Sequence, residues 1–179
     1  ALEQFKQAKR EMALPKVGAE HMGALRIAMD RDGQQDRPLW SVVDGSYTNG
    51  TFIKNLPPRT DVIDRIRRDA KLYYLPDGEQ RPNRVYGERA PTPEKLRQDD
   101  NVPWQKIEAF ATGKRHQFRV KTLSPFRWRS AGKEYDLRLI VIAPLAYRLT
   151  QQSKILYRQP SYLICTYPDI PVEEALQAY

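Results

Sequence analysis

Cysteine and histidine are scarce in this 179-residue chain, which contains one cysteine, Cys165, and two histidines. A single cysteine excludes an internal disulfide, and this usage is typical of a reducing cytoplasm. Three residues of these two types cannot supply the four ligands of a structural zinc site. We therefore expect a cytoplasmic protein in which Cys165 is a small, buried strand residue.

Long apolar runs are also missing. No run approaches the roughly 20 residues that a membrane-spanning helix needs, so no membrane partner is expected. The first residues, ALEQFKQAKREM, form an amphipathic pattern without the charged-then-apolar layout of a secretion signal. They also lack an initiator methionine, and we expect the chain to begin within a longer protein.

Positive charge is plentiful by comparison. The chain has 30 Lys plus Arg against 22 Asp plus Glu, a formal net charge of +8. For a domain this balance favours an anionic partner, and nucleic acid is the commonest one. The alternative is a basic surface with no specific partner.

Helical and strand patterns alternate through residues 1–75. Apolar spacing predicts a first helix that Pro15 ends and a second over about residues 19–31. The apolar run at 39–44 predicts a strand covered on both faces, and a second strand is expected at about 62–67. A short helix near Phe52 joins them. This order indicates an α/β fold with the two strands adjacent and parallel.

The pattern changes after this segment. Residues 76–168 begin with polar, turn-rich sequence, and from Trp104 to Tyr167 apolar and polar residues alternate, with Gly113 at a hairpin turn. This predicts a β-rich, mainly antiparallel insertion. Residues 169–179 read as the start of a further helix that the chain cuts short.

One acidic residue stands where a strand ends. In WSVVDGSYTNG, the apolar run stops at Asp44, and Gly45 permits a sharp turn. In open α/β sheets, ligands bind beyond the carboxyl ends of the strands, and a carboxylate there can hold Mg²⁺. The alternative is an Asp whose side chain caps the following turn.

A longer stretch carries a family resemblance. VVDGSYTNGTFIKNLPPRTDVIDRIRRDAKLY resembles the region around the second catalytic aspartate of DDE-type transposases from bacterial insertion sequences. Asp44, Gly45 and Tyr47 match that aspartate and the Gly and Tyr after it. The family's following R-x-R and L-Y resemble Arg65, Arg67 and the Leu72-Tyr73 pair. PVEEALQAY resembles the approach to the last catalytic helix, with Tyr179 in the place of its signature tyrosine.

The resemblance implies a fold and a chemistry. The fold is a partial RNase H-like α/β core with the β-rich insertion. The chemistry is DNA cleavage and strand transfer at transposon ends, in which two Mg²⁺ (or Mn²⁺) ions clamp the attacking and leaving oxygens. Asp44 is then a catalytic metal ligand. The family's first Asp and final Glu would lie outside residues 1–179, so we expect this fragment to be inactive alone. The remaining acids of the first segment are expected to be loop, cap or surface charges: Asp30, Asp32, Asp36, Asp61 and Asp64.

Basic residues of the β-rich segment are candidate DNA contacts. Arg115, Arg119 and Lys121 alternate within KRHQFRVKTL, so we expect one shared, exposed face that follows a DNA backbone. Arg127 and Arg129 extend this set. The alternative is an ordinary solvated face of a half-buried sheet.

Trp128 and the arginines of RIRR leave further alternatives open. Trp128 either stacks on an unpaired base or belongs to the core. Arg65, Arg67 and Arg68 either hold phosphates near Asp44 or pair with Asp64 and Asp69 at the sheet edge.

Three functions are therefore in competition. The first is a catalytic fragment of a transposase, and the intact transposase could form an oligomer in its complex with DNA. The second is a non-catalytic nucleic-acid-binding β module, and the third is a structural or interaction domain with incidental charge. Flanking catalytic carboxylates would distinguish the first, and salt-dependent DNA binding would separate the last two.

Overall fold

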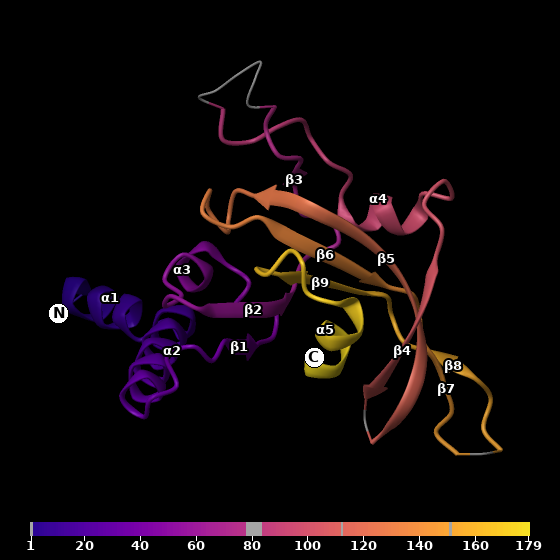
Figure 1. Ribbon diagram of the computed structural model, residues 1–179, viewed down its shortest axis with the longest axis horizontal. Helices are drawn as coiled ribbons and strands as arrows, with labels where there is room; N and C mark the ends of the chain where they lie inside the picture. Colours follow the sequence, from indigo (N-terminus) through magenta and orange to yellow (C-terminus); the bar gives the residue numbers. More distant parts are fainter. Residues whose placement is uncertain (1, 78–83, 112, 151) are drawn as a thin grey trace.

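A seven-stranded sheet runs through most of the protein (Figure 1). The computed structural model describes residues 2–77, 84–111, 113–150 and 152–179, so part of the turn-rich segment expected after residue 76 lies outside the described residues. The strands of this sheet are β1 (Leu39–Val42), β2 (Thr60–Arg65), β3 (Leu72–Tyr73), β4 (Gln105–Ala111), β5 (Lys114–Trp128), β6 (Leu137–Ile142) and β9 (Ser161–Cys165). Their order is β1-β2-β9-β6-β5-β3, and β4 pairs with β5. Strands β7 (Ala146–Tyr147) and β8 (Leu156–Tyr157) form a separate hairpin.

Five helices accompany the strands in the described residues: α1 (Leu2–Glu11), α2 (Leu14–Arg31), α3 (Gly50–Ile53), α4 (Pro93–Gln98) and α5 (Val172–Ala178). Helix α2 begins earlier than expected, because Pro15 lies in its first turn instead of only ending the helix before it. A proline is tolerated there because the first helical N–H groups have no intrahelical acceptor.

The parallel pair expected near Asp44 is confirmed. Strands β1 and β2 are parallel and adjacent, with Leu39 opposite Thr60 and Val42 opposite Ile63. Helix α3 lies between them in sequence. The side chain of Asn49 caps this helix by accepting hydrogen bonds from the N–H groups of Thr51 (3.0 Å) and Phe52 (3.1 Å).

The antiparallel arrangement of the later strands is also confirmed. Strands β4, β5, β6 and β9 pair antiparallel in succession. Strand β9 then pairs antiparallel with β2, so strands from residues 1–75 and from the β-rich segment share one sheet. The result is a mixed α/β structure with a mostly antiparallel sheet.

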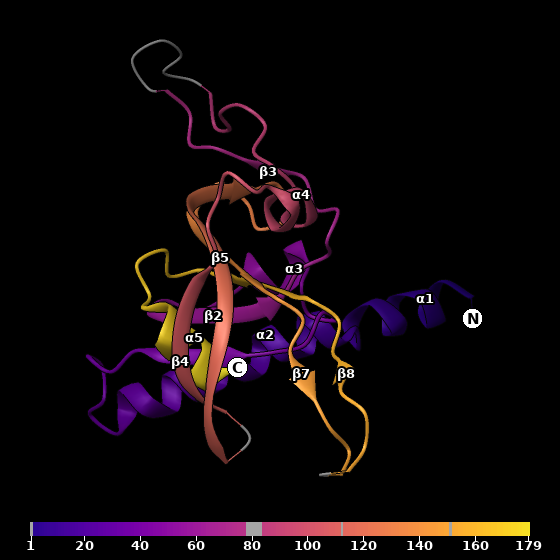
Figure 2. The same cartoon turned by 90° about the vertical axis from the view of Figure 1, so that its right-hand side faces the viewer.

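Alternation along the strands divides the core between the two faces of the sheet. Val62 and Ile66 of the β2 segment belong to one apolar cluster, together with Phe52 of α3. Ile63, with the opposite parity, packs in a second cluster with Leu176 of α5. Both views place α5 close to β4 (Figure 2). No helix in the described ranges is long and apolar enough to cross a membrane.

The expectation that Lys121 lies on an exposed basic face is wrong. Its side chain is 1% exposed, whereas Arg115 and Arg119 are exposed. The Lys121 ammonium donates hydrogen bonds to the carbonyl oxygens of Arg97 (3.0 Å) and Asp99 (2.6 Å), and lies 4.7 Å from the centre of the Trp104 ring. The end of α4 and the residues just after it therefore cover this part of β5, and their carbonyl groups accept hydrogen bonds from the buried lysine.

Replacing Lys121 with methionine should destabilise the protein by about 2 kcal/mol, because two carbonyl groups lose a charged donor while the apolar stem is retained. Arg119→Met, on the exposed part of the same strand, should change the free energy of unfolding by less than about 0.5 kcal/mol. Urea unfolding of both variants measures the difference. Equal stabilities would show that the buried lysine contributes nothing.

Candidate functional site

Asp44 lies just beyond the carboxyl end of β1 and is exposed to solvent, as the sequence predicted. Its Oδ1 accepts a hydrogen bond from the Ser46 N–H at 2.9 Å. The side chain therefore caps the following turn and still presents a carboxylate to solvent, so the two interpretations do not exclude each other. Asp44 supplies one hard oxygen ligand of the type Mg²⁺ prefers.

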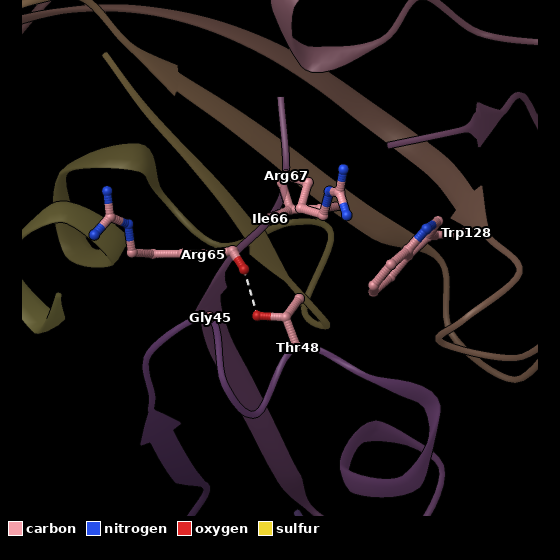
Figure 3. A pocket seen from close by; sticks show the side chains of 6 residues that line it. All are labelled: Gly45, Thr48, Arg65, Ile66, Arg67 and Trp128. Atoms are coloured by element: carbon pink, nitrogen blue, oxygen red, sulfur yellow. Dashed lines mark hydrogen bonds between the residues drawn. The ribbon is translucent and has the colours of Figure 1, made fainter. Parts of the chain in front are cut away.

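The loop after Asp44 is fastened to the end of β2. The Val43 N–H donates to the Ile63 carbonyl at 3.1 Å, which continues the parallel pairing past β1. The Thr48 hydroxyl donates to the Arg65 carbonyl oxygen (Figure 3). These bonds hold Asp44 at the same sheet edge as Arg65.

Of the two other residues of the resemblance in this loop, Tyr47 has a structural role and Gly45 has none that requires a glycine. Tyr47 is half-buried and packs edge-on against Phe52, with ring centres 5.4 Å apart. A Cβ atom added at Gly45 would come no closer than 3.8 Å to the Arg65 carbonyl oxygen, and Gly45 is not among the glycines with positive φ. The turn therefore does not depend on glycine.

A cavity of about 280 Å³ lies between this loop and the end of β5. Its lining consists of Gly45, Thr48, Arg65, Ile66, Arg67 and Trp128. In Figure 3 the Trp128 ring stands across the cavity from Thr48, while the Arg65 side chain points away from Trp128. Trp128 also packs against the core, so it is both a core residue and a cavity wall.

Tyr179, at the end of α5, belongs to the same neighbourhood. Its pKa is raised mainly by burial, and the charges of Arg65, Asp64 and Asp44 also act on it. The last helix thus returns to the edge of the sheet that carries Asp44.

Asp64 was expected to be a loop, cap or surface charge, and this is wrong. Its side chain is 0% exposed, and Oδ2 has no hydrogen-bond partner within the described part of the chain. Burial raises its pKa to about 7, the nearby Thr48 hydroxyl and the hydrogen bond that Oδ1 accepts from the Arg65 N–H (2.6 Å) oppose the rise, and the charge of Asp44 adds to it. The strand period was the missed signal, because it places Asp64 on the same face as Val62 and Ile66.

Asp64 should make stability depend on pH. Its folded-state pKa lies above the ordinary value of 3.8, so the unfolded chain ionises first as pH rises. The free energy of unfolding should therefore fall between about pH 4 and pH 7 and level off above, by an amount on the order of 2–4 kcal/mol.

Asp64→Asn should remove this slope, because the amide does not ionise in that range. Thermal and urea unfolding of both proteins from pH 4 to pH 8 measure the difference between them. A difference that does not change with pH would contradict the buried, neutral Asp64.

Of the other four acids expected to be loop, cap or surface charges, Asp32 and Asp36 are exposed, whereas Asp30 and Asp61 are partly buried and make contacts within the protein. Asp30 pairs with Arg26 (2.6 Å) and Arg59 (2.7 Å), and Asp61 accepts a hydrogen bond from the Thr166 hydroxyl (2.8 Å). No group of three or more His, Cys, Asp or Glu side chains that could hold a metal ion occurs in the described residues. Asp44 therefore fits a single metal ligand and does not form a complete site with them.

Several candidate DNA-binding arginines make contacts within the protein. Arg67 forks onto Asp69, through Nε (3.0 Å) and Nη2 (2.9 Å), although both remain exposed. Arg127 donates to Asp136 (2.7 Å) and to a backbone carbonyl. Arg129 lies 4.9 Å from the centre of the Tyr73 ring.

The exposed basic face is formed by two strands. On the β4–β5 hairpin, Arg115 lies opposite Phe110 and Arg119 lies opposite Lys106, and all four side chains are exposed. Directly opposed residues share a face in an antiparallel pair. Lys106 was missed because only the pairing register places it beside Arg119.

No family model, curated protein or solved structure matches the chain.

Proposed function

We propose that this chain is part of the catalytic domain of a DDE-type insertion-sequence transposase, with an RNase H-like core, and that Asp44 is its second catalytic aspartate. The observation that carries the proposal is the position of Asp44. It is an exposed carboxylate at the carboxyl end of a parallel strand pair, with Tyr179 of the last helix nearby.

The order of elements supports the proposal. A parallel β1–α3–β2 unit is followed by a long antiparallel segment, and the chain then enters a helix that packs near the first strands. This is the order that the family resemblance implies. The net charge of +8 supports DNA as the partner.

Mg²⁺ or Mn²⁺ is the proposed cofactor. Asp44 would hold it, together with carboxylates from segments outside residues 1–179. The ions would stabilise the attacking and leaving oxygens of phosphodiester displacement. The 179-residue chain is expected not to cleave DNA, because one carboxylate cannot fix two ions.

Asp44→Asn separates catalysis from turn capping. The amide oxygen still accepts from the Ser46 N–H, so the turn survives while the charge that holds the metal is lost. In a longer protein that includes both flanking catalytic carboxylates, Mg²⁺-dependent nicking of labelled DNA should be abolished by this change.

Asp36→Asn, which neutralises an exposed acid ahead of β1, is the matched control and should cleave normally. Cleavage by the Asp44→Asn protein would make Asp44 a turn cap only.

A non-catalytic nucleic-acid-binding module is the second candidate, favoured by the exposed basic face of the β4–β5 hairpin. Under both candidates the chain binds DNA weakly and without sequence preference, because phosphate contacts release counterions. The two candidates differ in one respect: only under the first does the longer protein cleave DNA.

Replacing Arg115 and Arg119 together with glutamine should weaken DNA binding and reduce the slope of log affinity against log salt by up to about 2. Fluorescence anisotropy with labelled duplex DNA between about 50 and 200 mM KCl measures this slope. Arg31→Gln, at the end of α2, should behave like the parent chain. An unchanged slope in the double variant would show that the hairpin does not contact DNA.

A further inference from the structure

A second cavity, of about 450 Å³, is lined in part by the segment that follows β2. Arg68, Glu94, Arg97, Gln159 and Tyr162 line it, together with two prolines. It adjoins the first cavity along the chain, because Arg67 lines the first and Arg68 lines the second. The two cavities therefore take part of their lining from consecutive residues of the segment that follows β2.

The single carboxylate in this cavity is already fully engaged. Arg97 forks onto Glu94, with Nε 2.8 Å from Oε2 and Nη2 2.6 Å from Oε1. Gln98 donates to Oε1 at 2.7 Å, and the Tyr162 hydroxyl donates to Oε2. A carboxylate offers about four acceptor positions, so these four bonds leave Glu94 no capacity for another cation.

Glu94 also stays ionised, because the hydrogen bonds from Arg97 hold its pKa at about 2. Two arginines and one glutamate line the cavity, so its wall carries an excess positive charge.

The remaining polar groups are mainly donors. The Arg68 side chain is exposed and makes no hydrogen bond or close ion pair with the described residues, although it acts on Glu94 and Asp69 at longer range. Its backbone is fixed by a 3.0 Å hydrogen bond from the Glu94 N–H to the Arg68 carbonyl. Gln159 adds an exposed amide. A guanidinium group with five N–H donors matches the oxygens of a phosphate.

We propose that this cavity is a phosphate-binding site, in which Arg68, backed by Arg97 and Gln159, holds one backbone phosphate of the nucleic acid engaged at the neighbouring Asp44 edge. The inference rests on the proposed function for the identity of the ligand. If both cavities contact the nucleic acid, its backbone runs from the first cavity, along the residues that follow β2, to α4.

The test compares DNA binding by the 179-residue chain and its Arg68→Gln variant, with labelled duplex and single-stranded DNA across a KCl series. Loss of one phosphate contact should reduce the slope of log affinity against log salt by about 0.7–0.9 and weaken binding several-fold at low salt. Arg68→Lys should restore the slope, because the charge is kept. Arg31→Gln is the charge-matched control, and thermal unfolding verifies that each variant is folded.

A second arm tests free phosphate. Inorganic phosphate at constant ionic strength should raise the melting temperature of the parent chain more than that of Arg68→Gln.

The outcomes separate the two claims. If the parent chain does not bind DNA, the proposed function fails and the ligand assignment falls with it. If the parent binds DNA but Arg68→Gln keeps both the parental slope and the parental response to inorganic phosphate, the phosphate site is wrong and the proposed function stands. If phosphate stabilises only the parent while the DNA slope is unchanged, the cavity takes a free phosphate and not a nucleic-acid backbone.

Discussion

Strand β2 is the element on which the arrangement of the protein depends. It pairs parallel with β1 on one side and antiparallel with β9 on the other, and so joins the first segment of the chain to the last strand. Thr166 reinforces this junction. Its Oγ1 accepts from the Val62 N–H at 2.9 Å, and its own N–H donates to the Val62 carbonyl at 3.1 Å. Because β2 is held from both sides, its carboxyl end becomes a fixed platform for the Asp44 loop.

The same platform accommodates polar groups at a cost. Asp64 is buried with one oxygen lacking a hydrogen bond, and burial of an ionised carboxylate in that position is unfavourable. Its raised pKa is the consequence. The Thr48 hydroxyl, which fastens the Asp44 loop to the Arg65 carbonyl, also lies close to the Asp64 carboxyl group. The loop that presents Asp44 is therefore coupled to the least well satisfied buried acid of β2.

Positive charge in the sequence is distributed among three different roles. Lys121 is buried inside the fold, where it donates hydrogen bonds to carbonyl groups at the end of α4 and just after it. Arg67 and Arg127 are paired with aspartates. Arg68, Arg115 and Arg119 remain exposed and are available to an anion. A net charge of +8 thus overstates how much positive surface is free for a partner.

Local patterns were sufficient for the parts of the structure that depend on near neighbours. The apolar run before Asp44, the alternation after Trp104 and the helix start near residue 170 all gave the right elements, because strand and helix periods act over a few residues. The same patterns correctly placed Asp44 at an exposed strand end. They failed at Lys121 and Asp64, since a residue's exposure depends on what packs against its strand from elsewhere. Only the tertiary structure brought α4 to Lys121, buried Asp64 in the core, set Lys106 opposite Arg119, and placed Tyr179 where the charges of Asp64 and Asp44 act on it. Each of these placements depends on burial or strand pairing that a window of a few residues does not contain.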